Sequence, residues 1–165
     1  MYDDRKYDDL WMDFAFRASL ESKCNRRKVG AIAVKDGRVI SLGWNGTHTG
    51  HPNECEDVTR DEAGNEVLTT KPAVIHAEAN MIGKLAGSAE SARGATIYIT
   101  DSPCLDCAKQ LAVAGVGTVV FFNAYRDMRG VEHLKACNVP VVRYKQQIQQ
   151  IIKDGLYSSG SPSIS

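Results

Sequence analysis

Hydrophobic and polar residues follow two different periods along the chain. Residues 8–22 carry apolar side chains at helical spacing and predict an N-terminal helix. The apolar positions are Leu10, Trp11, Phe14, Ala15 and Ala18. Residues 29–46 predict two strands joined by Asp36-Gly37, a dipeptide typical of hairpin turns. Residues 47–72 are polar and lack clear periodicity, and an irregular stretch of this length indicates a binding or lid role.

In the second half of the chain, predicted strands and helices alternate. The helices are expected at 74–87, 104–114, 130–137 and 145–156, and the strands at 95–100, 118–122 and 139–144. Strands connected through helices form parallel pairs with right-handed crossovers. Together with the N-terminal hairpin, this predicts an α/β fold with three layers, α/β/α, around a central five-stranded mixed sheet. We expect a single domain over 1–155 and a flexible tail over 156–165.

Composition narrows the classes of partner. The chain has 165 residues, of which 43% are hydrophobic, enough for one domain with a buried core. Lys plus Arg and Asp plus Glu both number 20, so the formal net charge is zero. Proteins that grip nucleic acid usually carry a basic excess, so the balance favours a small-molecule substrate and no nucleic-acid partner.

The N-terminal residues and the hydropathy of the chain indicate its cellular location. The first residues are acidic and mixed, unlike a secretory signal peptide. No apolar run approaches the roughly 18 residues that span a bilayer, so no membrane partner is expected. We expect a cytoplasmic protein, in the host cytoplasm if the source is a virus.

The chain has five cysteines, an odd number, and two of them form one C-x-x-C pair. Without an export signal, this pattern favours metal or thiol chemistry over a disulfide framework. Cys137 has no evident partner and is expected in the core.

Cys104 and Cys107 carry the most specific signal. They lie three positions apart at a predicted helix start, which puts both sulfurs on one face of the first turn. Pro103 suits the beginning of a helix, and the dipole there lowers the pKa of a thiol. His76 opens another predicted helix, so two helix N-termini can converge on one metal ion.

Three protein ligands leave a tetrahedral zinc ion with one open position, as in catalytic sites. Two thiolates and an imidazole cancel the charge of the ion, so a nearby base is needed to activate water, and Glu78 is the candidate. Residues two apart do not share a helix face. Glu78 therefore has to reach the water from a different side of the ion than a regular helix would give.

The order H-x-E followed by P-C-x-x-C is the signature of zinc nucleobase deaminases. On these residues the chain resembles the cytidine deaminase superfamily and, within it, the deoxycytidylate deaminases. The resemblance spans about residues 10–145 and is strongest in five stretches, at 21–24, 28–31, 43–46, 76–80 and 102–109. It implies a cytidine deaminase-like fold and the hydrolysis of dCMP to dUMP and ammonia, which supplies dUMP for thymidylate synthesis.

The resemblance also implies a role for each matching residue. A zinc ion on His76, Cys104 and Cys107 activates a water, and Glu78 moves protons from that water to the substrate. The implied substrate-binding residues, which include a sugar contact by Asn45 and ring packing by Tyr125, are Asn45, Ala77, Ser102, Tyr125 and Arg126. Arg126 and Arg129 both lie near Tyr125, and either could hold the 5′-phosphate.

Members of this family are hexamers that dCTP activates and dTTP inhibits, with Mg²⁺ on the triphosphate. The resemblance therefore implies a homo-hexamer with an effector site at Arg26, Lys28, Gly43, Trp44, Asn45 and Gly46. This chain has Trp44 where the family usually has a tyrosine.

Some related enzymes bind a second, structural zinc ion through a cysteine that matches Cys24 and another near Cys55. His48 and His51 could complete such a site here. Val74 stands where one enzyme type has an acidic ligand, so both possibilities, a second zinc or none, stay open.

Other functions compete with this interpretation. Within the superfamily, the chain could be a tRNA adenosine deaminase or a riboflavin-pathway deaminase, although the neutral charge disfavours the former. From another class, it could be a non-catalytic zinc- or nucleotide-binding module. The presence of Glu78 and the lack of an evident fourth ligand argue against that module.

Overall fold

The structure, a computed structural model, describes residues 3–144. The predicted helix at 145–156 and the tail lie outside the described residues. The helices are η1 (Asp4–Tyr7, a 3₁₀ turn), α1 (Asp8–Ser19), α2 (Ala77–Ala86), α3 (Leu105–Val113) and α4 (Arg129–Ala136). The strands are β1 (Gly30–Lys35), β2 (Arg38–Trp44), β3 (Glu56–Arg60), β4 (Glu66–Thr70), β5 (Thr96–Asp101), β6 (Thr118–Asn123) and β7 (Val141–Arg143).

The main sheet has five strands in the order β2-β1-β5-β6-β7, which confirms the predicted mixed sheet. β1 pairs antiparallel with both β2 and β5, whereas β5, β6 and β7 run parallel to one another. The β1–β2 turn has positive φ at Asp36 and Gly37, as the turn dipeptide predicts. The parallel strands place their carboxyl ends at one edge, from which the β5–α3 and β6–α4 loops leave.

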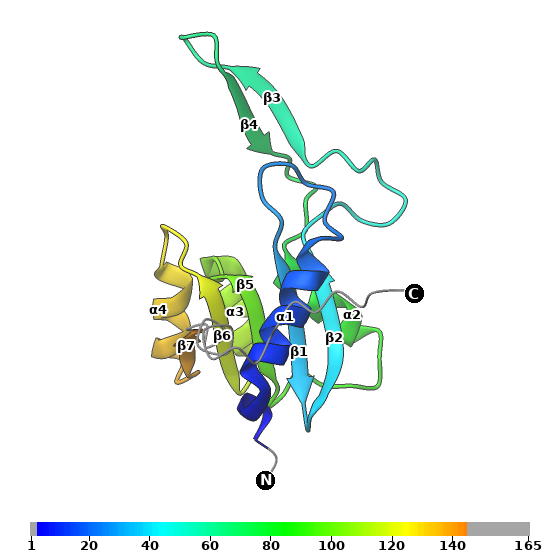
Figure 1. Cartoon of the computed structure of the whole chain (residues 1–165), viewed down its shortest axis with the longest axis vertical. Coiled ribbons are helices and arrows are strands. Elements are labelled where there is room, and N and C mark those ends of the chain that lie inside the picture. Colours follow the sequence, from blue (N-terminus) through cyan, green and yellow to red (C-terminus); the bar gives the residue numbers. More distant parts are fainter. Residues whose placement is uncertain (1–2, 145–165) are drawn as a thin grey trace, which may run out of the picture.

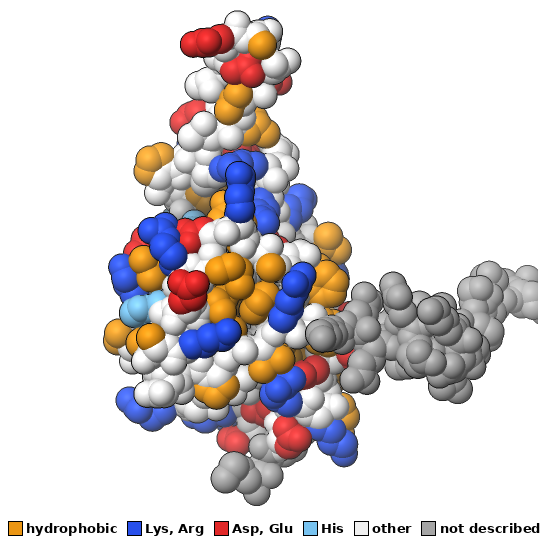
Figure 2. Space-filling view, turned by 90° about the vertical axis from the view of Figure 1, so that its left-hand side faces the viewer, with side chains coloured by type: hydrophobic (Ala, Val, Ile, Leu, Met, Phe, Trp, Pro, Cys, Tyr) orange, Lys and Arg blue, Asp and Glu red, His pale blue; other side chains and the backbone are white. Residues whose placement is uncertain are grey.

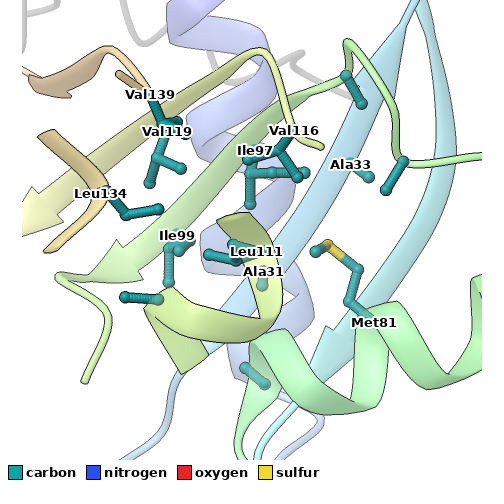
Figure 3. Close-up of a cluster of buried hydrophobic side chains, with 14 of the residues drawn as sticks. Ala31, Ala33, Met81, Ile97, Ile99, Leu111, Val116, Val119, Leu134 and Val139 are labelled. Atoms are coloured by element: carbon teal, nitrogen blue, oxygen red, sulfur yellow. The ribbon is translucent and has the colours of Figure 1, made fainter. Parts of the chain in front are cut away.

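Helices cover both faces of this sheet (Figure 1). On one face, Met81 of α2, Leu111 of α3 and Leu134 of α4 pack against Ile97 and Ile99 of β5. Figure 3 shows these side chains converging between the helices and the strands. On the other face, α1 packs against β1 and β5, and its core residues are Trp11, Met12 and Ala15. The predicted three-layer arrangement is therefore confirmed.

The α1 helix also departs from its predicted pattern. Trp11, Ala15 and Ala18 are buried as expected, but Leu10 and Phe14 are about half exposed. Apolar residues fill more of the helix circumference than the sheet can cover.

No helix within residues 3–144 is long and apolar enough to cross a membrane.

The segment 47–72 contains an unpredicted hairpin of β3 and β4, which pair only with each other among the described strands. The hairpin projects from the body of the molecule (Figure 1), and the projection also stands out in the space-filling view of Figure 2. Its tip is a turn in which the Asp61 carboxylate accepts hydrogen bonds from the amides of Ala63 and Asn65. Val58 is 60% exposed, so neither face of the hairpin is buried enough to leave an alternating pattern in the sequence.

Two predictions about cysteines were wrong. Cys137 is exposed rather than in the core, because it caps the C-terminal end of α4 with its sulfur 3.6 Å from His133 Nε2. Cys24 and Cys55 form a disulfide, although the sequence favoured metal or thiol chemistry. The two cysteines are 31 positions apart in the sequence, so their pairing depends on how the hairpin folds back. No local sequence pattern predicts it.

Candidate active site

His76, Cys104 and Cys107 come together at the N-termini of two helices. His76 is the N-cap of α2, and Cys104 is the N-cap of α3. His76 Nδ1 lies 3.4 Å from the Sγ atoms of both cysteines. Gly130 lets α4 lie close to the backbone of Pro103, since a Cβ at this position would lie 2.1 Å from the carbonyl oxygen of Pro103. The packing of three helices thus sets the position of the two sulfurs.

The geometry of these three side chains fits a zinc ion. Their ligand atoms all lie within 4.8 Å of one another. Ligands of a tetrahedral zinc ion are separated by about 3.5 Å, given bond lengths of about 2.0 Å to nitrogen and 2.3 Å to sulfur. The donor set of one imidazole and two thiolates is one that zinc prefers. Three ligands of this kind leave one coordination position for a water molecule.

The ionisation of the two thiols is strongly coupled. Hydrogen bonds from the Cys107 thiol and from His76 lower the pKa of Cys104 to about 4. The Cys104 thiolate in turn raises the pKa of Cys107, and burial raises it further. The hydrogen bond with Cys104 also raises the pKa of His76. His76 and Cys107 therefore hold their protons more tightly, and a bound cation would displace those protons.

Glu78 lies in the first turn of α2 and is buried, with 5% of its surface exposed. Burial raises the pKa of its carboxyl group to about 7, and the nearby charges of Cys104 and Asp101 act in the same direction. A carboxyl group with a pKa near neutrality can both accept and donate a proton, as a general acid–base catalyst must.

A cavity of about 520 Å³ opens over these residues and is lined by His76, Glu78 and Cys104. It also brings together the predicted substrate residues Asn45, Ala77, Ser102, Tyr125 and Arg126, and two of the predicted effector residues, Arg26 and again Asn45. The other lining residues, which the sequence analysis did not assign to the substrate site, are Arg27, Val29, Thr70, Val74 and Asp101. They come from separate loops and strand ends, so no single sequence motif groups them.

Comparisons with known proteins agree with this geometry. The family model for the cytidine and deoxycytidylate deaminase zinc-binding region matches residues 5–123. The chain belongs to the cytidine and deoxycytidylate deaminase family. As a member, it is an enzyme, a hydrolase that acts on a C–N bond.

Individual relatives of the deaminase are similar over most of its length. The deoxycytidylate deaminase of Enterobacteria phage T2 is 33% identical over 147 residues, covering 69% of this chain and 78% of the phage protein. The human deoxycytidylate deaminase is 32% identical over 127 residues, covering 74% and 68%. The crystal structure of dCMP deaminase from cyanophage S-TIM5 with dCMP and dUMP matches with a TM-score of 0.75 and 41% identity. That match covers 84% of this chain and 97% of the other.

In the deaminase, the side chains of Asn45 and Ser102 brace the walls of the cavity. Asn45 Oδ1 accepts a hydrogen bond from the amide of Val29, and its Nδ2 donates to the carbonyl of Arg27, both at 2.8 Å. Ser102 Oγ accepts a hydrogen bond from the amide of Tyr125 at 2.8 Å. Both residues therefore hold the loops that carry Arg27 and Tyr125.

The predicted effector residues Lys28, Gly43, Trp44 and Gly46 do not belong to the cavity lining. Gly43 has a packing role, because a Cβ there would lie 2.4 Å from the carbonyl oxygen of Ala77. The ring of Trp44 lies under Lys84, whose Nζ is 4.5 Å from the ring centroid. This element therefore joins β2 to α2, the helix that carries Glu78.

The Cys24–Cys55 disulfide fastens the base of the hairpin to the loop before β1. Glu56 strengthens the connection, since its carboxylate accepts hydrogen bonds from the amides of Asn25 and Arg26. Cys24, Cys55 and Glu56 are close enough to form a metal-binding group, and neither His48 nor His51 belongs to it. Because the two sulfurs are bonded to each other, they are not the thiolates that a second zinc site requires.

Proposed function

We propose that the deaminase hydrolyses dCMP to dUMP and ammonia, with a zinc ion held by His76, Cys104 and Cys107. The observation that carries this proposal is that His76, Cys104 and the buried Glu78 line one cavity, while the buried Cys107 Sγ lies 3.4 Å from His76 Nδ1. The relatives named deoxycytidylate deaminases, and the cyanophage enzyme that binds dCMP and dUMP, support dCMP as the substrate.

The reaction adds water at C4 of the cytosine ring and breaks the bond between C4 and the amino nitrogen. When bound, zinc lowers the pKa of a water molecule and so supplies the nucleophile. Glu78 accepts the proton of that water and delivers it to ring N3, which makes C4 more electrophilic. The same carboxyl group then carries a second proton, from the hydroxyl now on C4, to the amino nitrogen; the C4=O bond forms as the C4–N bond breaks, and ammonia leaves. The burial of Glu78 suits it to hold each proton between these steps.

The cavity walls orient the nucleotide. Tyr125 offers a ring for the cytosine to pack against, and Ser102 fixes the backbone of that tyrosine. Asn45 has one further amide hydrogen for the sugar besides the one it gives to Arg27. Ala77 is fully buried beside the ligand His76 and contributes an apolar floor.

The 5′-phosphate requires a cation that is free to bind it. Arg129 already pairs with Asp127 at 2.6 Å, and this pair lowers the pKa of Asp127 to about 2. Arg126 lines the cavity, and Arg26 lines it too, donating to the uncharged hydroxyl of Thr70 at 3.3 Å. We therefore assign the phosphate to Arg126, with Arg26 beside it.

We predict that Arg126→Gln raises the KM for dCMP about tenfold or more and narrows the preference for dCMP over deoxycytidine, because a charge-assisted hydrogen bond is lost. Steady-state kinetics with both substrates measure this. Arg129→Gln is the matched control and should leave both KM values unchanged. Equal loss of activity toward dCMP and deoxycytidine in Arg126→Gln would contradict the assignment.

An ammonia-release assay with dCMP, dCTP, deoxycytidine and CMP tests the activity itself. We expect dCMP to have the highest kcat/KM, and a zinc chelator to abolish turnover. A preference for another compound, or full activity after zinc removal, would refute the proposed function. The same assay separates dCMP deamination from the activities of other family members.

We further propose that dCTP activates and dTTP inhibits the enzyme, each with Mg²⁺, at an element formed by Arg26, Lys28, Gly43, Trp44, Asn45 and Gly46. The packing of this element against α2 supports a path from the effector to Glu78. We propose a homo-hexamer, a single domain over 1–155, a cytoplasmic location and a role in supplying dUMP for thymidylate synthesis. Rates measured with and without each triphosphate, and sedimentation in their presence, test the regulation and the assembly. Equal rates would refute the regulation.

A further inference from the structure

Asp101 is an acidic side chain placed where an anionic substrate would meet it. It ends β5, is 7% exposed and lines the cavity with Glu78. A buried carboxylate is costly unless it is paired, and here Arg27 Nε lies 3.0 Å from Asp101 Oδ2. Arg27 comes from the loop before β1, so this pair fixes the direction of a side chain that starts outside the sheet.

Arg27 makes a second contact, with Tyr125. The guanidinium carbon of Arg27 lies 4.5 Å from the centroid of the Tyr125 ring. A guanidinium group is planar, so its edge can donate to a carboxylate while its face stacks on an aromatic ring. Arg27 does both at once. Asp101, at the edge of the guanidinium, therefore determines where its face meets the ring.

These contacts join three loops that are distant in the sequence. Asn45 Nδ2 holds the carbonyl of Arg27, and Ser102 Oγ holds the amide of Tyr125, each at 2.8 Å. The backbones of Arg27 and Tyr125 are thus fixed independently of Asp101. What remains for Asp101 to fix is the orientation of the two flat side chains, which form one wall of the cavity.

We infer that Asp101 is a positioning residue of this deaminase: through the Arg27 guanidinium it holds the Tyr125 ring where the pyrimidine packs. This inference rests on the proposed function, which gives Tyr125 its stacking role. A purely structural role would change the melting temperature. The positioning role changes nucleotide affinity, and it does so only while Arg27 and Tyr125 are both present.

A double-mutant cycle measured by calorimetry tests the inference. The zinc-loaded protein is titrated with dUMP, which is not turned over. We expect Asp101→Asn and Arg27→Gln each to raise the Kd of dUMP about threefold to tenfold. The double variant should bind no more weakly than the weaker single variant, because both changes break one chain of contacts. In a Tyr125→Leu background, Asp101→Asn should have no further effect.

Two variants sharpen the test. Arg27→Lys keeps the charge opposite Asp101 but loses the flat face, so it should not restore affinity. Arg38→Gln breaks an ion pair of similar length, with Glu90 at 3.1 Å, which is more exposed and outside the cavity lining, and it should leave the Kd unchanged. Arg27→Gln alters an exposed loop, so it tests the same contact even if Asp101→Asn does not fold.

Unchanged affinity in Arg27→Gln, full affinity in Arg27→Lys, or additive effects in the double variant would each overturn the inference. Ammonia release from dCMP by the unaltered protein is measured in parallel. Failure of that reaction refutes the proposed function. Normal turnover together with unaltered dUMP binding in the variants refutes the positioning role alone.

Discussion

At the scale of single residues, the relation of His76 to Glu78 depends on where α2 begins. Two residues at that spacing within a helix would point to different sides. His76 is the N-cap and has extended backbone angles, φ −69° and ψ 154°, so only Glu78 follows helical geometry. Both side chains can therefore line one cavity. The motif predicts both as site residues, and their convergence follows from a backbone conformation that the motif does not encode.

We predict that Glu78→Gln lowers kcat about 10²- to 10⁴-fold, because the amide cannot carry the proton. The zinc content and the Kd of dUMP should stay within about twofold of the unaltered protein, since the shape of the side chain is kept. Stopped-flow or steady-state rates, metal analysis and calorimetry measure the three quantities. A variant that retained full turnover would remove Glu78 from the mechanism.

At the scale of elements, the sequence predicted those that bury an apolar face. α1, α2, α3 and all five strands of the main sheet lie within a few residues of their predicted bounds. The reason is that burying one face of an element imposes a regular spacing on its hydrophobic residues. The β3–β4 hairpin was missed because its strands bury neither face, as the exposed Val58 illustrates. The pairing of Arg27 with Asp101 was not predicted for another reason: it arises only when separate loops meet.

The contact between β2 and α2 gives a prediction at this scale. We expect Gly43→Ala to destabilise the protein by about 1–3 kcal/mol, because the added methyl group overlaps the α2 backbone. Displacement of α2 should also lower kcat. Gly83→Ala is the matched control within α2, where a Cβ has open space, and it should stabilise by about 0.5–1 kcal/mol. Urea unfolding of both variants checks this, and equal effects would contradict the packing argument.

At the scale of the whole molecule, the α1 layer is attached to the sheet by tyrosine hydroxyls as well as by its apolar face. Tyr98, buried at the centre of β5, donates a hydrogen bond of 2.7 Å to the Asp8 carboxylate. Tyr144, which directly follows β7, donates to Asp9. Burial and the hydrogen bond to Asp8 raise the pKa of Tyr98, because both favour the neutral phenol.

This attachment predicts a pH dependence of stability. A folded-state pKa above the unfolded value of about 10 gives a stabilisation that is complete below pH ~10 and is lost as the pH rises further. At pH 8, Tyr98→Phe should be less stable by about 1 kcal/mol. Above pH ~10, the difference in unfolding free energy between the two proteins should shrink. Urea unfolding at several pH values measures it, with the exposed Tyr7→Phe as control.

The projecting β3–β4 hairpin has a practical consequence. Its tip is closed by local hydrogen bonds at Asp61, while the disulfide and Glu56 secure its base beside the loop that carries Arg26 and Arg27. A fluorophore attached to an exposed side chain of the tip would therefore lie away from the body of the molecule (Figure 1). The hairpin offers a handle by which this enzyme could be labelled or immobilised while it works.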